Sequence, residues 1–179
     1  MKTLTILRHA KSGWDDPVLR DFDRPLNAKG QRAARLMGHH LASLGMRFDH
    51  VAASSAVRVR ETMDDFTRGY GDLTPPEWDK ALYLASAETL LDHVHALPDD
   101  IARVLLVGHN PGLEDLVLML TPDDGAGPRD AVEEKFPTAS VAEIDFAVEH
   151  WADVKAGGGV LKRFIRPRDL DATLGPDGE

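Results

Sequence analysis

The stretch Val104-Leu105-Leu106-Val107-Gly108-His109-Asn110-Pro111-Gly112 decides the fold. Its first four residues form a continuous apolar run, which is typical of a central strand covered by helices on both faces. The run ends at a glycine, and Pro111 suits the first turn of a helix that the apolar pattern predicts over residues 113–120. A buried strand that leads directly into a helix indicates an α/β fold.

The rest of the chain alternates in the same way. Apolar runs predict further strands over residues 4–7, 48–53, 81–84, 138–146 and 159–165. Helices are predicted from the N-cap Asn27 to Gly45, from the candidate caps Ser54 and Ser55 to Tyr70, and over residues 87–97. Residues 14–25 and 122–128 are predicted to be loops. We therefore expect a three-layer α/β/α sandwich with a mostly parallel central sheet.

Length and composition limit the possible functions. The chain has 179 residues and carries a net charge of −9, which argues against nucleic acid or an anionic membrane as its main partner. It contains no cysteine, so disulfides, Cys-ligated zinc and thiolate catalysis are excluded. The N-terminus has no signal-peptide pattern and no apolar run approaches 18 residues, which predicts a soluble cytoplasmic protein. We expect one domain over residues 1–166 and a flexible tail over residues 167–179.

Charged side chains follow three of the predicted strands, as Arg8-His9, Arg58 and His109. Ligands of open α/β sheets bind at the carboxyl ends of the strands, so neighbouring parallel strands would bring these four residues together. Two guanidinium forks suit the oxygens of a phosphoryl group, and a neutral imidazole is a competent nucleophile. The pattern predicts a phosphoryl-transfer site in which His9 is the nucleophile and which needs no metal or other cofactor.

Each of these features alone has a simpler interpretation. An isolated histidine at a strand end is usually structural, residues 108–112 could serve only as a strand-to-helix turn, and Arg58 could be a solvated helix charge. Their joint occurrence favours the functional interpretation. The helical pairs His39-His40 and His93/His95 lack the spacing of metal ligands on one helix face, and the acidic stretch Asp15–Asp23 lacks calcium-loop spacing, so we predict no metal site there.

The motifs together resemble the histidine phosphatase superfamily, and within it the SixA-type phosphohistidine phosphatases. The resemblance is carried by Leu7-Arg8-His9-Ala10-Lys11-Ser12, by Asp23-Arg24-Pro25-Leu26-Asn27-Ala28-Lys29-Gly30, by residues 54–62 and by Gly108-His109-Asn110. It covers roughly residues 3 to 165. It implies a phosphoglycerate mutase-like fold with a reduced cap.

The resemblance also implies roles for individual residues. His9 would become phosphorylated, while Arg8, Arg58 and His109 would bind the phosphoryl group, with Lys11, Ser12 and Asn110 as further substrate-binding residues. A phosphate or sulfate ion is expected to fit the same site. Ala10 stands where many members of the superfamily have glycine, and we expect a hydrogen bond from Nδ1 to fix the tautomer of His9.

Larger members of the superfamily insert a helical cap and a general acid, and the short stretch between Tyr70 and Arg103 leaves little room for either. Glu88 is the candidate acid in that stretch, although it could equally be a first-turn carboxylate that favours the helix dipole. Phosphohistidine leaves as an imidazole that solvent can protonate, so a thinly covered site without an acid favours a phosphohistidine on a protein. The resemblance suggests histidine-phosphotransfer domains or phosphotransferase-system carriers as partners.

Two alternatives remain at this stage. The first is a small-molecule phosphomonoesterase of the same superfamily, and the second is a phosphoprotein-binding module that has lost hydrolysis.

Overall fold

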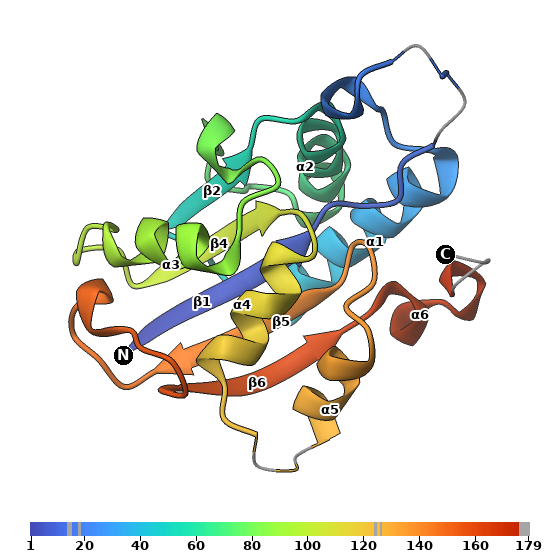
Figure 1. Ribbon diagram of the computed structural model, residues 1–179. Coiled ribbons are helices and arrows are strands. Elements are labelled where there is room, and N and C mark those ends of the chain that lie inside the picture. The colour runs from blue at the N-terminus through green and yellow to red at the C-terminus, as the bar shows by residue number, and fades with distance from the viewer. Residues whose placement is uncertain (14–15, 18, 124, 126, 176–179) are drawn as a thin grey trace.

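The computed structural model describes residues 1–13, 16–17, 19–123, 125 and 127–175. Within them one sheet has the strand order β3-β2-β4-β1-β5-β6 (Figure 1). The strands are β1 (Lys2–Arg8), β2 (His50–Ser54), β3 (Glu77–Asp79), β4 (Arg103–Gly108), β5 (Val141–Phe146) and β6 (Gly159–Ile165). Strands β1 to β4 run parallel, whereas β5 is antiparallel to both β1 and β6. The predicted mostly parallel sheet is confirmed.

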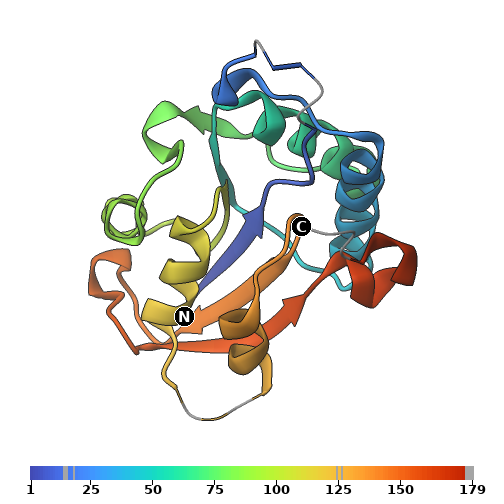
Figure 2. The same cartoon turned by 45° about the vertical axis from the view of Figure 1, so that its right-hand side comes forward.

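Helices cover both faces of this sheet (Figures 1 and 2). One face carries α1, α2 and α6, and the other carries α3, α4 and α5. Their bounds are Ala28–Ser43 (α1), Val57–Tyr70 (α2), Ala87–His95 (α3), Gly112–Leu120 (α4), Gly127–Glu134 (α5) and Pro167–Leu170 (α6). Short 3-10 turns lie at Asp21–Asp23 (η1), Lys80–Leu82 (η2), Trp151–Asp153 (η3) and Ala172–Leu174 (η4). The three-layer α/β/α sandwich is therefore present.

The central strands divide the core into two halves. Leu4 and Ile6 of β1 pack in the cluster that includes α3 and α4, whereas Leu7 packs in the cluster formed with α1 and α2. Side chains of a strand alternate between its two faces, so a strand buried on both faces needs an unbroken apolar run. The run over residues 104–107 satisfies this need, and all four side chains are buried.

Two sequence-based predictions about local structure are wrong. Residues 81–84 do not form a strand, because the Asp79 side chain accepts a hydrogen bond from the backbone N–H of Ala81 at 2.8 Å and starts the turn η2. Leu84, the last residue of the predicted strand, has a positive φ of 51° and is 54% exposed. Ser54 and Ser55 do not cap α2, whose N-cap is Ala56. Helix α5 was not anticipated from its acidic, proline-containing sequence.

The segment after β6 also differs from the expected flexible tail. Residues 167–175 form α6 and η4, and Leu174 is buried against Ala10, Leu26 and Ala33. The Lys29 Nζ donates to the carbonyl of Gly175 at 2.6 Å, which fixes the end of η4 on α1. Residues 176–179 lie outside the described residues. Among the described residues, no helix has the length and apolar character needed to cross a lipid bilayer.

Candidate active site

Three parallel strands end at one edge of the sheet and bring the predicted histidines together. Arg8 at the end of β1 is in register with Gly108 at the end of β4, so His9 and His109 follow at the same level. Their ring centroids are 5.3 Å apart. The backbone N–H of His9 donates to the carbonyl of Gly108 at 3.0 Å, which holds the two loops in this position. The expected convergence at the carboxyl edge is present.

Arg58 lies between the two imidazoles. It projects from the first turn of α2, and its Nε donates to His9 Nε2 at 3.4 Å while its Nη2 donates to His109 Nδ1 at 3.2 Å. The exposed fractions are only 7% for His9, 3% for Arg58 and 3% for His109. One guanidinium therefore contacts both rings inside a nearly closed site.

A backbone carbonyl fixes the tautomer of His9. Its Nδ1 lies 2.7 Å from the carbonyl oxygen of Ala10, and since a carbonyl only accepts, Nδ1 carries the proton. Nε2 then keeps its lone pair and accepts from Arg58. The loop is held by Thr62, whose hydroxyl accepts from the N–H of Ala10 at 2.9 Å. The expected hydrogen bond from Nδ1 is thus present with alanine at position 10.

His109 adopts the opposite tautomer. An arginine only donates, so the Nδ1 that faces Arg58 is unprotonated and Nε2–H donates to Ser54 Oγ at 2.8 Å. Ser54 is fully buried at the end of β2. Its hydroxyl therefore orients His109 and does not cap α2, whose N-cap is Ala56, two residues further along the chain.

Both imidazoles are held in the neutral state. Burial is the largest cause that lowers the pKa of His9 well below its usual range, and the charges of Arg8, His109 and Arg58 lower it further against the Ala10 hydrogen bond. Burial, followed by the charge of Arg58, lowers the pKa of His109 to about 3. A neutral His9 with a free Nε2 lone pair has the protonation state of a nucleophile.

Two residues that the sequence did not single out complete the site. Asp21 in η1 accepts from Arg58 Nη2 at 3.0 Å through its carboxylate and from Nη1 at 2.7 Å through its carbonyl. Tyr83 donates its hydroxyl to the same carboxylate and packs edge-on against His109, with the ring centroids 5.3 Å apart. Neither residue stands in a motif or a periodic pattern that would distinguish it. The loop predicted over residues 14–25 did not indicate that Asp21 reaches Arg58.

Strong hydrogen bonds keep this carboxylate ionised. Burial raises the pKa of Asp21, but hydrogen bonds from Tyr83, Arg24 and Arg58 outweigh it and bring the pKa to about 2. Burial and the neighbouring carboxylate raise the pKa of Tyr83. Asp21, in η1, covers Arg58, and Tyr83, the residue after η2, covers His109. The site is therefore less open than the short segment between Tyr70 and Arg103 suggested.

The remaining predicted residues lie at different distances from this centre. The Arg8 Nη1 and the Asn110 Nδ2 both donate to the carbonyl of Phe136, at 3.1 and 2.9 Å, and the charge of Arg8 contributes to lowering the pKa of both site histidines. Ser12 accepts from Arg24 at 2.6 Å, so its hydroxyl supports the η1 loop. Lys11 lines a separate pocket beside the site.

Glu88 lies exposed in the first turn of α3, where Ser86 is the N-cap. This position suits both a general acid and a first-turn carboxylate that favours the helix dipole, so the role of Glu88 as an acid stays a prediction. Within the described part of the chain, no three His, Asp or Glu side chains are grouped so as to hold a metal ion, and Asp15 lies outside that part.

Known proteins share this sequence and this fold. Residues 4–83 match the model of the histidine phosphatase superfamily (branch 1). An uncharacterized protein of Mycobacterium tuberculosis is 35% identical over 164 residues, which are 90% of this chain and 100% of the relative. The crystal structure of a protein assigned as the phosphohistidine phosphatase SixA of Agrobacterium tumefaciens is 30% identical, with a TM-score of 0.79 over 93% of this chain and 98% of that chain. The structure of a protein assigned as the phosphohistidine phosphatase SixA of Nakamurella multipartitia is 29% identical in sequence to this chain. Its TM-score is 0.80, over 93% of this chain and 96% of that chain.

The fold, the paired histidines at the sheet edge and these matches have one common explanation, which is that the chain belongs to the histidine phosphatase superfamily. It is a phosphatase by that membership, and its structural neighbours place it with the SixA-type proteins of the superfamily.

Proposed function

We propose that this phosphatase removes the phosphoryl group from phosphohistidine on a protein, through a covalent intermediate on Nε2 of His9. The observation that carries the proposal is the state of His9, whose Nδ1–H is held by the Ala10 carbonyl at 2.7 Å while Nε2 faces Arg58. The similarity to SixA-assigned proteins at 30% and 29% identity supports the choice of substrate class.

The arginines bind the phosphoryl group and orient it for attack. The guanidinium of Arg58 adjoins Nε2 of His9, so a phosphoryl oxygen bound by Arg58 lies near the nucleophile. Arg8 supplies a second positive charge near both histidines. The phosphoryl oxygens must compete with the Asp21 carboxylate for Nη2 of Arg58, so substrate binding displaces this carboxylate from Arg58.

His109 changes from acceptor to donor when the substrate binds. In the unliganded site its Nδ1 is unprotonated, since burial and Arg58 lower its pKa to about 3. A phosphoryl dianion beside the ring raises that pKa, because an opposite charge nearby favours the imidazolium. The protonated Nδ1 then donates to a phosphoryl oxygen, while Nε2–H remains bound to Ser54.

The reaction proceeds in two displacements. The Nε2 lone pair of His9 attacks phosphorus, the P–N bond of the substrate breaks, and the released imidazole takes its proton from solvent. Water then attacks the phosphoryl group on His9, which releases phosphate and regenerates the neutral imidazole. An imidazole leaving group needs no positioned acid, which is consistent with the exposed position of Glu88.

The first test is a substrate panel with the purified protein. We expect a phosphohistidine protein to be turned over much faster than sugar phosphates, with an acid-labile phosphoryl group trapped on Nε2 of His9 by rapid quenching and identified by NMR. Much faster ester turnover would identify a small-molecule phosphomonoesterase instead. Stable labelling without release, or no labelling at all, would indicate a binding module.

The second test addresses the nucleophile and the absence of a metal. We expect His9→Ala to reduce turnover by at least 10³-fold, while its circular dichroism spectrum and melting curve stay close to those of the parent protein. Incubation with EDTA should leave activity unchanged. A large loss with EDTA that added Mg²⁺ restores would contradict the metal-independent reaction.

A further inference from the structure

The carboxylate of Asp21 borders the place where a phosphoryl group would be bonded to His9. Nε of Arg58 contacts Nε2 of His9 at 3.4 Å, whereas Nη2 of the same guanidinium donates to Oδ2 of Asp21 at 3.0 Å. A phosphoryl group that is bonded to His9 and bound by Arg58 therefore has Asp21 on the side away from the nucleophile. Water must attack phosphorus in line, from the side opposite the P–N bond. Asp21 lies on the side from which that water comes.

Two residues hold this carboxylate independently of Arg58. Oδ1 accepts from Nη1 of Arg24 at 3.0 Å, and Oδ2 accepts from the hydroxyl of Tyr83. These two hydrogen bonds remain when phosphoryl oxygens take Nη2 of Arg58. Because a carboxylate oxygen can accept two hydrogen bonds, the displacement frees one acceptor position on Oδ2. A water molecule beside the phosphoryl group can then donate to it.

The environment of Asp21 suits the transfer of a proton. Its side chain is 38% exposed while Arg58 is buried, so the carboxylate lies between solvent and the closed part of the site. Burial raises the pKa of Asp21, and hydrogen bonds from Tyr83, Arg24 and Arg58 lower it to about 2. Loss of the Arg58 hydrogen bond and the approach of a phosphoryl dianion both raise that pKa. The carboxylate therefore becomes a stronger base when phospho-His9 is present.

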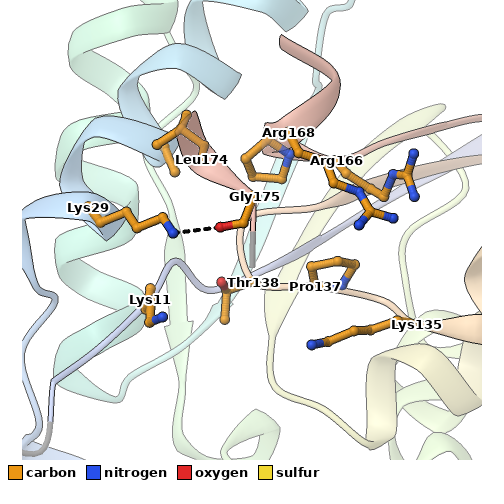
Figure 3. Close-up of a pocket in the computed structure, with 11 residues that line it drawn as sticks. Lys11, Lys29, Lys135, Pro137, Thr138, Arg166, Arg168, Leu174 and Gly175 are labelled. Atoms are coloured by element: carbon orange, nitrogen blue, oxygen red, sulfur yellow. Dashed lines mark hydrogen bonds between the residues drawn. The ribbon is translucent and has the colours of Figure 1, made fainter. Parts of the chain in front are cut away.

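The wall formed by residues 136–138 offers no comparable group. The carbonyl of Phe136 accepts from Arg8, and Pro137 and Thr138 line the adjacent pocket among α1, α6 and η4 (Figure 3). The described residues that line this pocket include lysines and arginines but no aspartate or glutamate. Within the described part of the chain, Asp21 is the carboxylate that pairs with Arg58. It is thus the base that the geometry favours.

We propose that Asp21 is the general base of the second displacement and removes a proton from the water that attacks phospho-His9. This inference rests on the proposed function. One O–H bond of the water breaks and its proton passes to Oδ2 of Asp21, while the oxygen forms a bond to phosphorus. The P–Nε2 bond breaks, its electron pair returns to Nε2, and hydrogen phosphate leaves. Nδ1 of His9 keeps its proton on the Ala10 carbonyl, so the released imidazole is neutral, and Asp21 returns its proton to solvent.

The first test follows phospho-His9 in a single turnover with a radiolabelled phosphohistidine protein and rapid quenching. We expect Asp21→Asn to form phospho-His9 at a rate close to that of the parent protein but to lose it at least about 10²-fold more slowly. Cleavage of the P–N bond is measured in place of released phosphate, because tighter phosphate binding would slow release alone. Asp23→Asn is the matched control, since Asp23 lies in the same turn and pairs with Arg20 at the surface. Decay of phospho-His9 at the parental rate in Asp21→Asn would overturn the proposal.

The second test separates proton removal from support of Arg58. An amine attacks phosphorus with its own lone pair, so it needs no base to remove a proton beforehand. Hydroxylamine should therefore dephosphorylate phospho-His9 in Asp21→Asn at close to the parental rate, although water does so slowly. An equal loss with both nucleophiles would show that Asp21 acts by positioning Arg58 and would overturn the role of a base.

A further pair of variants tests whether the carboxylate itself is needed. Asp21→Glu keeps a carboxylate and should lose phospho-His9 faster than Asp21→Asn, and the reverse order would contradict a base at this position. Accumulation of phospho-His9 in Glu88→Gln but not in Asp21→Asn would assign the role to Glu88 and overturn the proposal.

The outcomes distinguish this inference from the proposed function. If no phosphoryl group is trapped on His9 of the parent protein, the proposed function fails on its own test. If phospho-His9 forms in the parent protein and in Asp21→Asn and decays equally fast in both, the role of Asp21 is wrong and the proposed function stands.

Discussion

At the scale of single residues, Asp21 has the least expected contacts of the active site. Its carboxylate and its carbonyl together occupy both terminal nitrogens of Arg58, the residue that faces His9 and His109. Hydrogen bonds keep the pKa of this carboxyl at about 2 despite partial burial, so it is an anion at any physiological pH. A phosphoryl dianion bound at Arg58 is therefore opposed by a neighbouring negative charge.

Replacing this charge should strengthen phosphate binding. Asp21→Asn keeps the size of the side chain and its acceptor oxygen but removes the repulsion, so we expect the Kd of inorganic phosphate to fall about fivefold, which corresponds to about 1 kcal/mol. Isothermal titration calorimetry at fixed ionic strength measures it. Asp23→Asn is the control, since Asp23 lies in the same turn and pairs with Arg20 at the surface. Weaker phosphate binding in Asp21→Asn would show instead that Asp21 holds Arg58 in position.

The sequence predicted the residues that follow buried strands and did not predict those that reach the site from loops. Arg8, His9 and His109 could be placed because strand registry fixes where a strand end lies. Asp21 could not, because nothing distinguishes it from its acidic neighbours in the stretch 15–23 until Arg58 is located. Ser54 was assigned a capping role from its residue type, and only the position of His109 reveals its actual partner.

At the scale of elements, the crossing of α1 and α2 positions Arg58 and depends on two glycines. A Cβ on Gly38 would lie 2.0 Å from the carbonyl oxygen of Phe66, and one on Gly69 would lie 1.9 Å from that of Arg35. Each glycine therefore lets the backbone of the partner helix approach closely. The sequence predicted both helices, from the N-cap Asn27 and from the candidate caps Ser54 and Ser55. The distance between the two helices depends on how they pack against each other, so the sequence of one helix alone does not predict it.

Alanine at this crossing should destabilise the fold despite its better helix propensity. Propensity favours Gly69→Ala by about 1 kcal/mol, yet the clash with the backbone of α1 must push the helices apart, at a cost of roughly 1–3 kcal/mol. We expect a net decrease in the free energy of unfolding and a shifted Arg58, read by urea denaturation and by a raised KM. Gly127→Ala in α5 is the control, because a Cβ there has open space. Unchanged stability in Gly69→Ala would contradict the tight crossing.

At the scale of the whole molecule, the neutral histidines link stability to pH. Burial is the first cause of the lowered pKa of His9, of His93 and of His109, whereas the unfolded chain titrates near 6.5. Below pH 6.5 the unfolded chain therefore binds more protons than the folded protein. The free energy of unfolding should fall as the pH decreases from about 6.5, and these groups should have little effect above it.

The contribution of His109 can be isolated, since its folded-state pKa of about 3 leaves it neutral throughout the range from pH 4.5 to 6.5. Each such histidine adds a slope of up to about 1.4 kcal/mol per pH unit well below its unfolded-state pKa. Urea unfolding of the parent protein at several pH values measures how the free energy of unfolding changes with pH, and this slope should be the sum of the contributions of the buried histidines. The His109→Asn variant should show a slope that is smaller by the contribution of about one bound proton. An unaltered slope in His109→Asn would mean that His109 is protonated in the folded protein, and the inferred switch from acceptor to donor on substrate binding would then lose its basis.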